Sequence, residues 1–219
     1  MNSLTTTPLA PLLDALLKEN TASETRLTEL QLSREELDRL MRSKTEYRSF
    51  YGSLKDMPLA VSRETGLLLY MLARACRARN IVEFGTSFGV STLFLAAALR
   101  DNGGGKLVTS EFEPSKVTKA RENLIRGGLI DLVEIREGDA LQTLGARLPE
   151  TIDLLLLDGS KALYFEILTL LESRLKPGTL ILSDDADYCP EYLAHVRSPA
   201  NGYMSAPVTD GVELSLRLG

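Results

Sequence analysis

The amino-acid sequence predicts an α/β fold, in which a mostly parallel seven-stranded sheet ends in an antiparallel hairpin and extra helices precede the sheet. From Asn80 onward, strand-like apolar runs alternate with helical patterns, which is typical of a parallel sheet covered by helices. Ile152–Leu157 is apolar at every position except Asp153, and its four consecutive leucines are expected of a strand buried on both faces. Asp210 and Gly211 join the last two strand-like runs and give a strong hairpin signal.

Residues 1–55 are predicted to form helices that pack on the main domain or on a second subunit, as a lid or a dimer interface. Leucines recur at helical spacing over residues 8–19. Ser33 followed by Glu36 is a capping-box pattern that begins a second helix. The apolar faces of these helices must be covered. We expect the aromatic residues that follow to serve this packing rather than to contact a substrate; they are Tyr47, Phe50 and Tyr51.

The main domain is expected to span residues 56–219. It begins with a helical stretch over residues 59–78, for which Ser62 is the candidate N-cap. The apolar run around Val82 is the first strand, and Pro114 suits the start of a later helix. A turn at Lys176-Pro177-Gly178 precedes the fifth strand. The further strands are expected at residues 106–111, 132–136, 152–157, 179–183, 202–208 and 212–218, and the further helices at residues 90–99, 114–126 and 162–175.

The stretch of residues 80–91 has the pattern of a strand, a glycine-containing turn and a helix. In an open parallel sheet, ligands bind outside the carboxyl ends of the strands, and this turn is such an end. Gly85 and Gly89 permit a ligand to approach the backbone closely. Ser87 occupies the middle glycine position of the dinucleotide fingerprint, so a pyrophosphate ligand is disfavoured.

Acidic residues follow successive predicted strands, and parallel strands bring those ends to one edge of the sheet. Taken singly, each acid is most simply a helix N-cap or a solvated loop residue. Glu111, however, lies 26 residues beyond Gly85, where an acid can accept both hydroxyls of a ribose. Together with a turn that lacks the pyrophosphate pattern, this favours S-adenosylmethionine over NAD. The acidic residues concerned are Glu83, Glu111, Asp139, Asp158, Asp184 and Asp185, of which Asp139 would lie near the adenine.

Three of these acids form a candidate metal site. Asp158, Asp184 and Asp185 offer carboxylates without a nitrogen or sulfur ligand, which favours a hard divalent cation. Mg²⁺ is the first choice, with Ca²⁺ or Mn²⁺ as alternatives. Lys161 can reach the same edge and is a candidate base. The alternative is a salt-bridged network that Lys161 closes without a metal.

Composition and charge exclude several classes of function. The net charge of −5 and the lack of a Lys/Arg cluster argue against nucleic-acid binding. No apolar run approaches the roughly 18 residues of a membrane span, and no signal-peptide pattern opens the chain, so we expect a cytoplasmic protein without a membrane partner. Cys76 and Cys189 are expected to be free thiols, and His195, the only histidine, excludes a multi-histidine metal site.

Five motifs in register strengthen this interpretation. Through them, residues 56–219 resemble the cation-dependent class I O-methyltransferases, the group that contains catechol O-methyltransferase and the caffeoyl-CoA type enzymes. The motifs are V-E-F-G-T-S-F-G-V-S-T (residues 82–92), K-L-V-T-S-E-F-E-P (106–114), G-D-A-L (138–141), L-L-D-G-S-K-A-L-Y (156–164) and K-P-G-T-L-I-L-S-D-D (176–185).

The resemblance implies a Rossmann-like methyltransferase domain that acts on a small catechol-like aromatic, in a homodimer. It implies that a divalent ion binds the diol, Lys161 takes a proton, and the oxygen attacks the sulfonium methyl in line. The catalytic residues would be Lys161, Asp158 and Asp185. The cofactor residues would be Glu83, Gly85, Thr86, Ser87, Gly89 and Ser91 for the methionine moiety, Glu111 for the ribose, Asp139 and Ala140 for the adenine, and Asp158.

Two departures from the family keep alternatives open. Asp185 stands where the family usually has Asn, which adds a negative charge, and Ser160 stands where many members carry Asp. One alternative is a metal-independent methyltransferase that acts on a nitrogen or a carboxylate of a small molecule. The other is a non-catalytic nucleoside-binding protein.

Overall fold

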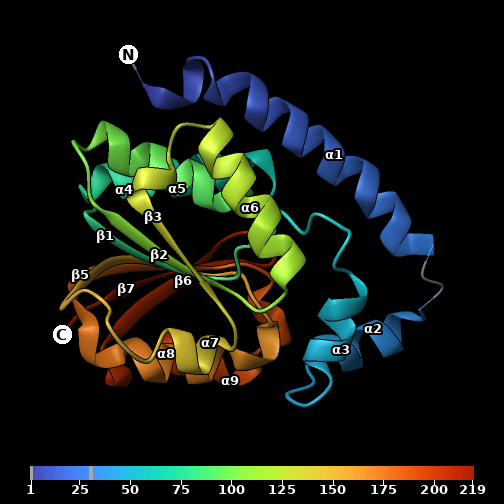
Figure 1. Cartoon of the computed structure of the whole chain (residues 1–219). Helices are drawn as coiled ribbons and strands as arrows, with labels where there is room; N and C mark the ends of the chain where they lie inside the picture. The colour runs from blue at the N-terminus through green and yellow to red at the C-terminus, as the bar shows by residue number, and fades with distance from the viewer. Residues whose placement is uncertain (1, 30–31) are drawn as a thin grey trace.

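Seven strands form one sheet in the order β3-β2-β1-β4-β5-β7-β6. The computed structural model describes residues 2–29 and 32–219 (Figure 1). The five strands from β3 to β5 are parallel, and β7 runs antiparallel to both β5 and β6. The predicted α/β fold class with its antiparallel C-terminal hairpin is confirmed. The strands are β1 (Asn80–Phe84), β2 (Lys106–Glu111), β3 (Val133–Glu137), β4 (Ile152–Leu157), β5 (Leu175–Ser183), β6 (Tyr203–Thr209) and β7 (Val212–Arg217).

Helices cover both faces of the sheet (Figure 1). One face carries α4 (Arg63–Ala75), α5 (Val90–Asp101) and α6 (Pro114–Arg126), and the other carries α7 (Ala140–Thr143), α8 (Tyr164–Leu171) and α9 (Pro190–Val196). Short 3-10 turns lie at Ser3–Thr5, Ile130–Leu132, Lys161–Leu163, Glu172–Arg174, Ala186–Tyr188 and Pro199–Asn201. The helices α7 and α9 were not predicted, because four and seven residues are too few to display a helical period.

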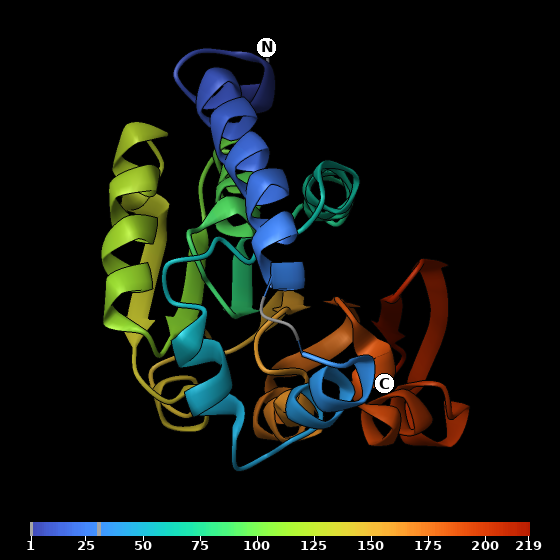
Figure 2. The same ribbon diagram turned by 90° about the vertical axis from the view of Figure 1, so that its right-hand side faces the viewer.

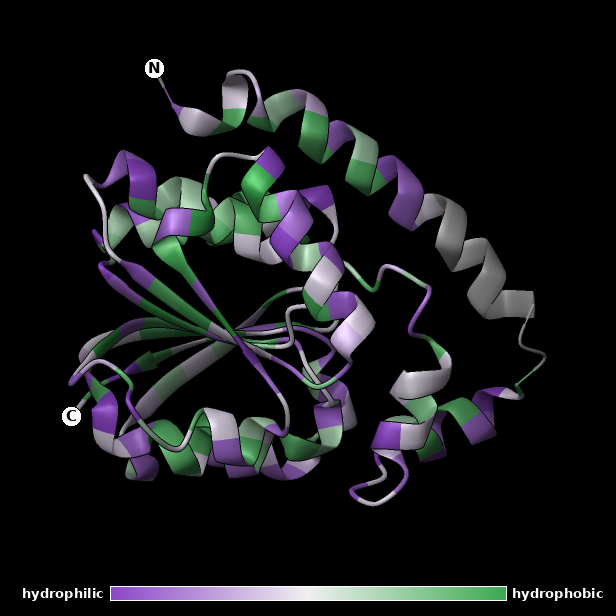
Figure 3. Cartoon of the chain, in the orientation of Figure 1, coloured by the Kyte–Doolittle hydropathy of each residue, from purple (hydrophilic) through white to green (hydrophobic). Residues whose placement is uncertain are grey.

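The core has two halves, one on each side of the sheet. In β4, Leu154 and Leu156 face the half that contains α5, whereas Leu155 and Leu157 face the half that contains α8. This alternation explains why the last four positions of the predicted strand are all leucine. Hydrophobic residues, green in Figure 3, run along the central strands and recur on the helices that cover them.

The predicted turn before the fifth strand was wrong. Lys176-Pro177-Gly178 lies inside β5, where the pairing with β4 passes from Leu175 opposite Ile152 to Leu180 opposite Leu154. The extra residues form an irregularity in the strand and do not end it. The predicted helix at residues 59–78 begins only at Arg63, where the Ser62 hydroxyl accepts a hydrogen bond from the Thr65 amide.

The N-terminal helices take two different positions. α1 (Leu9–Glu29) lies across α5 and α6, and its buried leucines belong to the core on that side. α2 (Arg34–Met41), with the predicted capping box of Ser33 and Glu36, and α3 (Tyr47–Ser53) lie beside the carboxyl ends of the parallel strands (Figures 1 and 2). Over residues 2–29 and 32–219, no helix has the length and apolar character of a membrane span.

Candidate active site

A cavity of about 590 Å³ opens between the carboxyl ends of the parallel strands and the segment that contains α2 and α3. Its volume is in the range of small-molecule sites. The turns after β1, β2, β3, β4 and β5 form its floor, so one cavity collects residues that are far apart in the chain. Of the predicted site residues, the following line it: Gly85, Ser87, Glu111, Asp139, Ala140, Asp158, Lys161, Asp184 and Asp185.

The other predicted cofactor residues, Glu83, Thr86, Gly89 and Ser91, do not line this cavity. Glu83 is fully buried and accepts hydrogen bonds of 2.6 Å from the hydroxyls of Ser91 and Thr92. Burial raises the pKa of its carboxyl to about 7. Glu83 therefore links β1 to α5 behind the turn. The Thr86 hydroxyl shares a 2.6 Å hydrogen bond with Thr109, which links the same turn to β2.

Gly85 allows two turns of the floor to touch. Its φ is +102°, and a Cβ atom there would lie 2.4 Å from the carbonyl oxygen of Asp158. A side chain at this position would push the Asp158 backbone away. Contact between the turns after β1 and β4 thus requires a glycine at this position. The sequence suggested only that this glycine lets a ligand approach the backbone.

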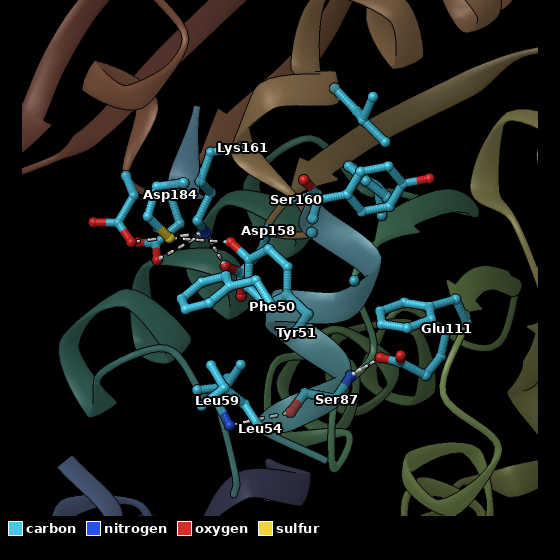
Figure 4. Close-up of a pocket in the computed structure, with 18 of the residues that line it drawn as sticks. Phe50, Tyr51, Leu54, Leu59, Ser87, Glu111, Asp158, Ser160, Lys161 and Asp184 are labelled. Carbon is cyan, nitrogen blue, oxygen red and sulfur yellow. Dashed lines mark hydrogen bonds and ion pairs between the residues drawn. The ribbon is translucent and has the colours of Figure 1, made fainter. Parts of the chain in front are cut away.

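Glu111 is fixed by two backbone donors. Its Oε2 accepts a 2.9 Å hydrogen bond from the Ser87 amide, and its Oε1 accepts a 3.0 Å hydrogen bond from the Glu113 amide (Figure 4). Burial raises the pKa of Glu111, against the effect of these amides. Each oxygen keeps a second acceptor position, so Glu111 can accept two further hydrogen bonds from a ligand in the cavity it lines.

The three predicted metal ligands surround the side chain of Lys161. Its Nζ lies 2.8 Å from Oδ1 of Asp158, 3.9 Å from Oδ2 of Asp184 and 3.8 Å from Oδ2 of Asp185 (Figure 4). The Lys161 and Asp158 side chains are only 6% and 12% exposed, whereas that of Asp185 is 50% exposed. The strand ends therefore bring these four residues together, in the salt-bridged arrangement that the sequence left open.

The electrostatics of this cluster keep Lys161 charged. Burial on its own would lower the pKa of the lysine, but the charges of Asp158 and its neighbours raise that pKa well above the ordinary value. Burial raises the pKa of Asp158, and the ammonium of Lys161 opposes that rise. A lysine can act as a general base only as its neutral amine, so Lys161 can accept a proton only when the charge of the surrounding carboxylates is reduced.

The donor chemistry of Asp158, Asp184 and Asp185 fits a hard divalent cation, because all the ligand atoms are carboxylate oxygens. Their present arrangement does not amount to a metal centre. In the part of the chain that the structure describes, no group of three or more His, Cys, Asp or Glu side chains is placed so that it could hold a metal ion. The carboxylates converge on the Lys161 ammonium instead.

The N-terminal aromatics pack on neighbouring apolar residues, as the sequence predicts, and they also line the cavity from the side of α3. Tyr47, Phe50 and Tyr51 all line the cavity, together with Leu54 and Leu59 (Figure 4). Phe50 and Tyr51 are in edge contact at 5.1 Å between ring centroids, and burial raises the pKa of Tyr51 to about 12.

Three basic residues join the segment that contains α2 and α3, which forms the roof of the cavity, to residues of the main domain. Arg42 donates hydrogen bonds to the carbonyl oxygens of Asp187 and Tyr188. Lys44 pairs with Glu166 and Glu191, each at 2.5 Å. Arg48 pairs with Asp139 at 2.7 Å, and Asp139 also caps α7 by accepting from the Leu141 amide. The segment between α2 and α3 is thereby held across the cavity.

Ser160 shows that the cavity has a polar position to fill. Its hydroxyl is buried, lines the cavity and has no hydrogen-bond partner among the described residues. A buried hydroxyl without a partner is unfavourable, so a ligand that supplies one would be stabilised here. A cavity of this size, with Glu111 and Ser160 in its walls, fits a nucleoside-containing cofactor.

Comparison with known proteins finds similarity to methyltransferases. A family profile described as a methyltransferase domain matches residues 82–186. A catechol O-methyltransferase of Niastella koreensis is 37% identical over 130 residues, which cover 58% of this chain and 58% of that protein. Catechol O-methyltransferase B of Danio rerio is 30% identical over 183 residues, which cover 75% of this chain and 68% of that protein.

Solved structures of O-methyltransferases are similar to this chain as well. The O-methyltransferase TomG of Streptomyces achromogenes, involved in tomaymycin synthesis and determined in complex with S-adenosylmethionine, superposes with a TM-score of 0.65 at 25% identity. That match covers 92% of this chain and 98% of the other. The chain spans about half the length of the bacterial catechol O-methyltransferases that it matches in sequence.

Proposed function

The chain belongs to the class I S-adenosylmethionine-dependent O-methyltransferase family, and on that premise we propose that it transfers a methyl group from S-adenosylmethionine to a hydroxyl of a small aromatic molecule. The observation that carries this proposal is the shared cavity. Glu111, Asp139 and Ala140 line it together with Asp158 and Lys161, so a cofactor and an acceptor can meet within one enclosure.

The cofactor would lie along the floor of the cavity. Gly85 and Ser87 are proposed to hold the methionine end, with Glu83, Thr86, Gly89 and Ser91 supporting the turn from behind. Glu111 would accept the ribose hydroxyls, and Asp139 and Ala140 would border the adenine. The complex of TomG with S-adenosylmethionine supports this assignment by analogy of fold.

The acceptor would lie beneath the aromatic roof. Phe50, Tyr51 and Leu54 offer flat apolar contacts, and the Asp158–Lys161 cluster lines the same cavity. Such a site suits an aromatic ring that presents a hydroxyl to the cluster. A catechol-like acceptor agrees with the similarity of this chain to bacterial and fish catechol O-methyltransferases.

Asp158, Asp184 and Asp185 are proposed to hold a divalent cation, Mg²⁺ before Ca²⁺ or Mn²⁺. When bound, such an ion supplies Lewis acidity that lowers the pKa of an acceptor hydroxyl. Lys161 is the proposed base: its neutral amine takes the hydroxyl proton, the oxygen forms a bond to the methyl carbon, and the carbon–sulfur bond breaks. The electron pair stays on sulfur and neutral S-adenosylhomocysteine leaves.

One observation favours a second candidate, a metal-independent methyltransferase acting on a nitrogen or a carboxylate. The three carboxylates already enclose an ammonium group, that of Lys161. The same oxygens can hold the amine of an acceptor without a metal. In that reaction Lys161 would balance charge and would not need to accept a proton.

Methyl transfer from labelled S-adenosylmethionine to a catechol, measured before and after EDTA treatment, separates the two candidates. We expect activity to fall at least tenfold in EDTA and to return with Mg²⁺. Asp185→Asn should change the Mg²⁺ requirement, whereas Asp187→Asn, at an exposed position in the same loop, should not. Unchanged turnover of every catechol in EDTA contradicts the metal, and near-normal activity of Lys161→Ala favours the second candidate.

We further propose that the protein is a homodimer and acts in the cytoplasm. The apolar residues Leu9, Leu12, Leu13 and Leu16 of α1 are buried within the chain, so the dimer contact would use other surfaces. Light scattering coupled to size exclusion tests the assembly: a monomer at micromolar concentration contradicts it.

A further inference from the structure

A second buried lysine lines the cavity and has no hydrogen-bond or ion-pair partner among the described side chains. Lys116, in the first turn of α6, is 4% exposed. Lysine is rarely buried unless it is paired. Among the side chains that the structure describes, those of residues 2–21 and 32–219, no acceptor makes a hydrogen bond with its ammonium and no carboxylate lies within 4.0 Å. Its one described contact is with the face of Phe88, at 5.9 Å from Nζ to the ring centroid.

The contrast with Lys161 shows what is missing. Both lysines line the same cavity, but Lys161 is 2.8 Å from a carboxylate, whereas Lys116 has only the more distant charges of Glu111, Glu113 and Asp158 around it. Burial lowers the pKa of Lys116, and these charges oppose that change. The ammonium lines the cavity and is partly desolvated, so a ligand that supplies a hydrogen-bond acceptor there would be stabilised.

The position of Glu111 indicates what the missing acceptor is. Both oxygens of Glu111 already accept backbone amides, from Ser87 and Glu113, and no hydrogen bond joins Glu111 to Lys116. A hydroxyl between them can donate its hydrogen to the carboxylate and accept a hydrogen bond from the ammonium. A ribose offers such hydroxyls. The carboxylate of Glu111 can only accept a hydrogen bond from a hydroxyl, and the ammonium of Lys116 can only donate one to it.

We propose that Lys116 is a cofactor-binding residue whose ammonium donates a hydrogen bond to a ribose hydroxyl oxygen of the nucleoside that Glu111 holds. This inference rests on the proposed function, because it takes S-adenosylmethionine as the occupant of the cavity. It adds a residue that the five sequence motifs do not single out, since an isolated lysine on a helix has the pattern of a solvated side chain.

The test measures the affinity for S-adenosylhomocysteine and the unfolding temperature of the unliganded protein in the same variant. Lys116→Met keeps most of the unbranched side chain and removes the ammonium with its charge. We expect binding to weaken roughly tenfold to a hundredfold, as for loss of a charged hydrogen bond. The unliganded variant should unfold at the same temperature as the wild type or higher, because the substitution removes no hydrogen bond or ion pair between described residues. A purely structural lysine would give the opposite pattern, with lower stability and unchanged affinity.

Two comparisons make the test specific. Lys119→Met, at an exposed position of the same helix, should change neither quantity. The loss in Lys116→Met should persist with 5′-methylthioadenosine, which lacks the amino-acid end, and shrink to within twofold for its 2′-deoxy or 3′-deoxy form. A wild type that binds S-adenosylhomocysteine while Lys116→Met binds it equally well overturns this inference alone. A wild type that does not bind it overturns the proposed function as well.

Discussion

The ammonium of Lys161 donates a 2.8 Å hydrogen bond to Asp158, and both side chains are buried beneath the aromatic roof. Breaking a buried pair leaves an uncompensated charge. Lys161→Met is therefore expected to lower the free energy of unfolding by about 3–5 kcal/mol and to abolish methyl transfer. Urea unfolding measures the first effect and the labelled-methyl assay the second.

Lys176 provides the matched control for that variant. It pairs with Asp153 at 2.6 Å, but its side chain is 47% exposed. Lys176→Met should lower the free energy of unfolding by less than about 1 kcal/mol. Equal losses in the two variants would show that the Lys161 cluster is solvated, contrary to the structure.

Gly85→Ala tests the contact between the two turns of the floor. The new Cβ would meet the Asp158 carbonyl at 2.4 Å, in a backbone conformation that also disfavours alanine. We expect weaker binding of S-adenosylhomocysteine together with a loss of more than about 2 kcal/mol in the free energy of unfolding.

The control for this variant is Gly128→Ala. Gly128 has a φ of +70° and no atom within 4 Å of a built Cβ. The Gly128→Ala variant has the same unfavourable backbone conformation without the collision. Its free energy of unfolding should fall by only about 1 kcal/mol, and its affinity for S-adenosylhomocysteine should not change. If Gly85→Ala behaves like Gly128→Ala, the Gly85–Asp158 contact has no role in the site.

Glu83 predicts a pH dependence of stability. Burial raises its pKa in the folded protein from 4.5 to about 7, so the folded state binds the proton more tightly than the unfolded state. Stability from this group is present below pH 4.5 and is lost as pH rises to 7, by about 3 kcal/mol in total. Glu83→Gln cannot titrate and should lack this loss.

Urea unfolding at intervals from pH 4.5 to pH 8 measures this loss of stability. The difference in free energy of unfolding between wild type and Glu83→Gln should shift steadily in favour of the variant as pH rises, then level off above pH 7. The exposed Glu122→Gln should give a curve parallel to the wild type. A parallel curve for Glu83→Gln would contradict the burial of an ionisable carboxyl at this position.

Local patterns were sufficient for most of the fold. β2, β4 and α6 have the predicted bounds, because a short strand-like segment, a run of four leucines and a proline at a helix start are each encoded within a few residues. The gathering of Glu111, Asp158 and Lys161 was also predictable, since parallel strands end at one edge.

Contacts between distant segments could not be predicted from the sequence. Phe50 and Tyr51 meet the Asp158–Lys161 region across more than a hundred residues, and an aromatic that faces a core has the same local pattern as one that faces a ligand. For Glu83, the residue type suggested a binding role. Only the structure shows that its strand position turns the carboxyl toward Ser91 and Thr92, away from the cavity.

Titration of S-adenosylhomocysteine into three proteins by calorimetry tests the central claim most directly. We expect the wild type to bind one equivalent, Glu111→Ala to bind roughly a hundredfold more weakly, and Glu137→Ala to bind like the wild type. Glu137 is the matched control, because it is the exposed partner of Glu111 in register on the neighbouring strand β3. No binding to the wild type, or equal binding to Glu111→Ala, would contradict the account.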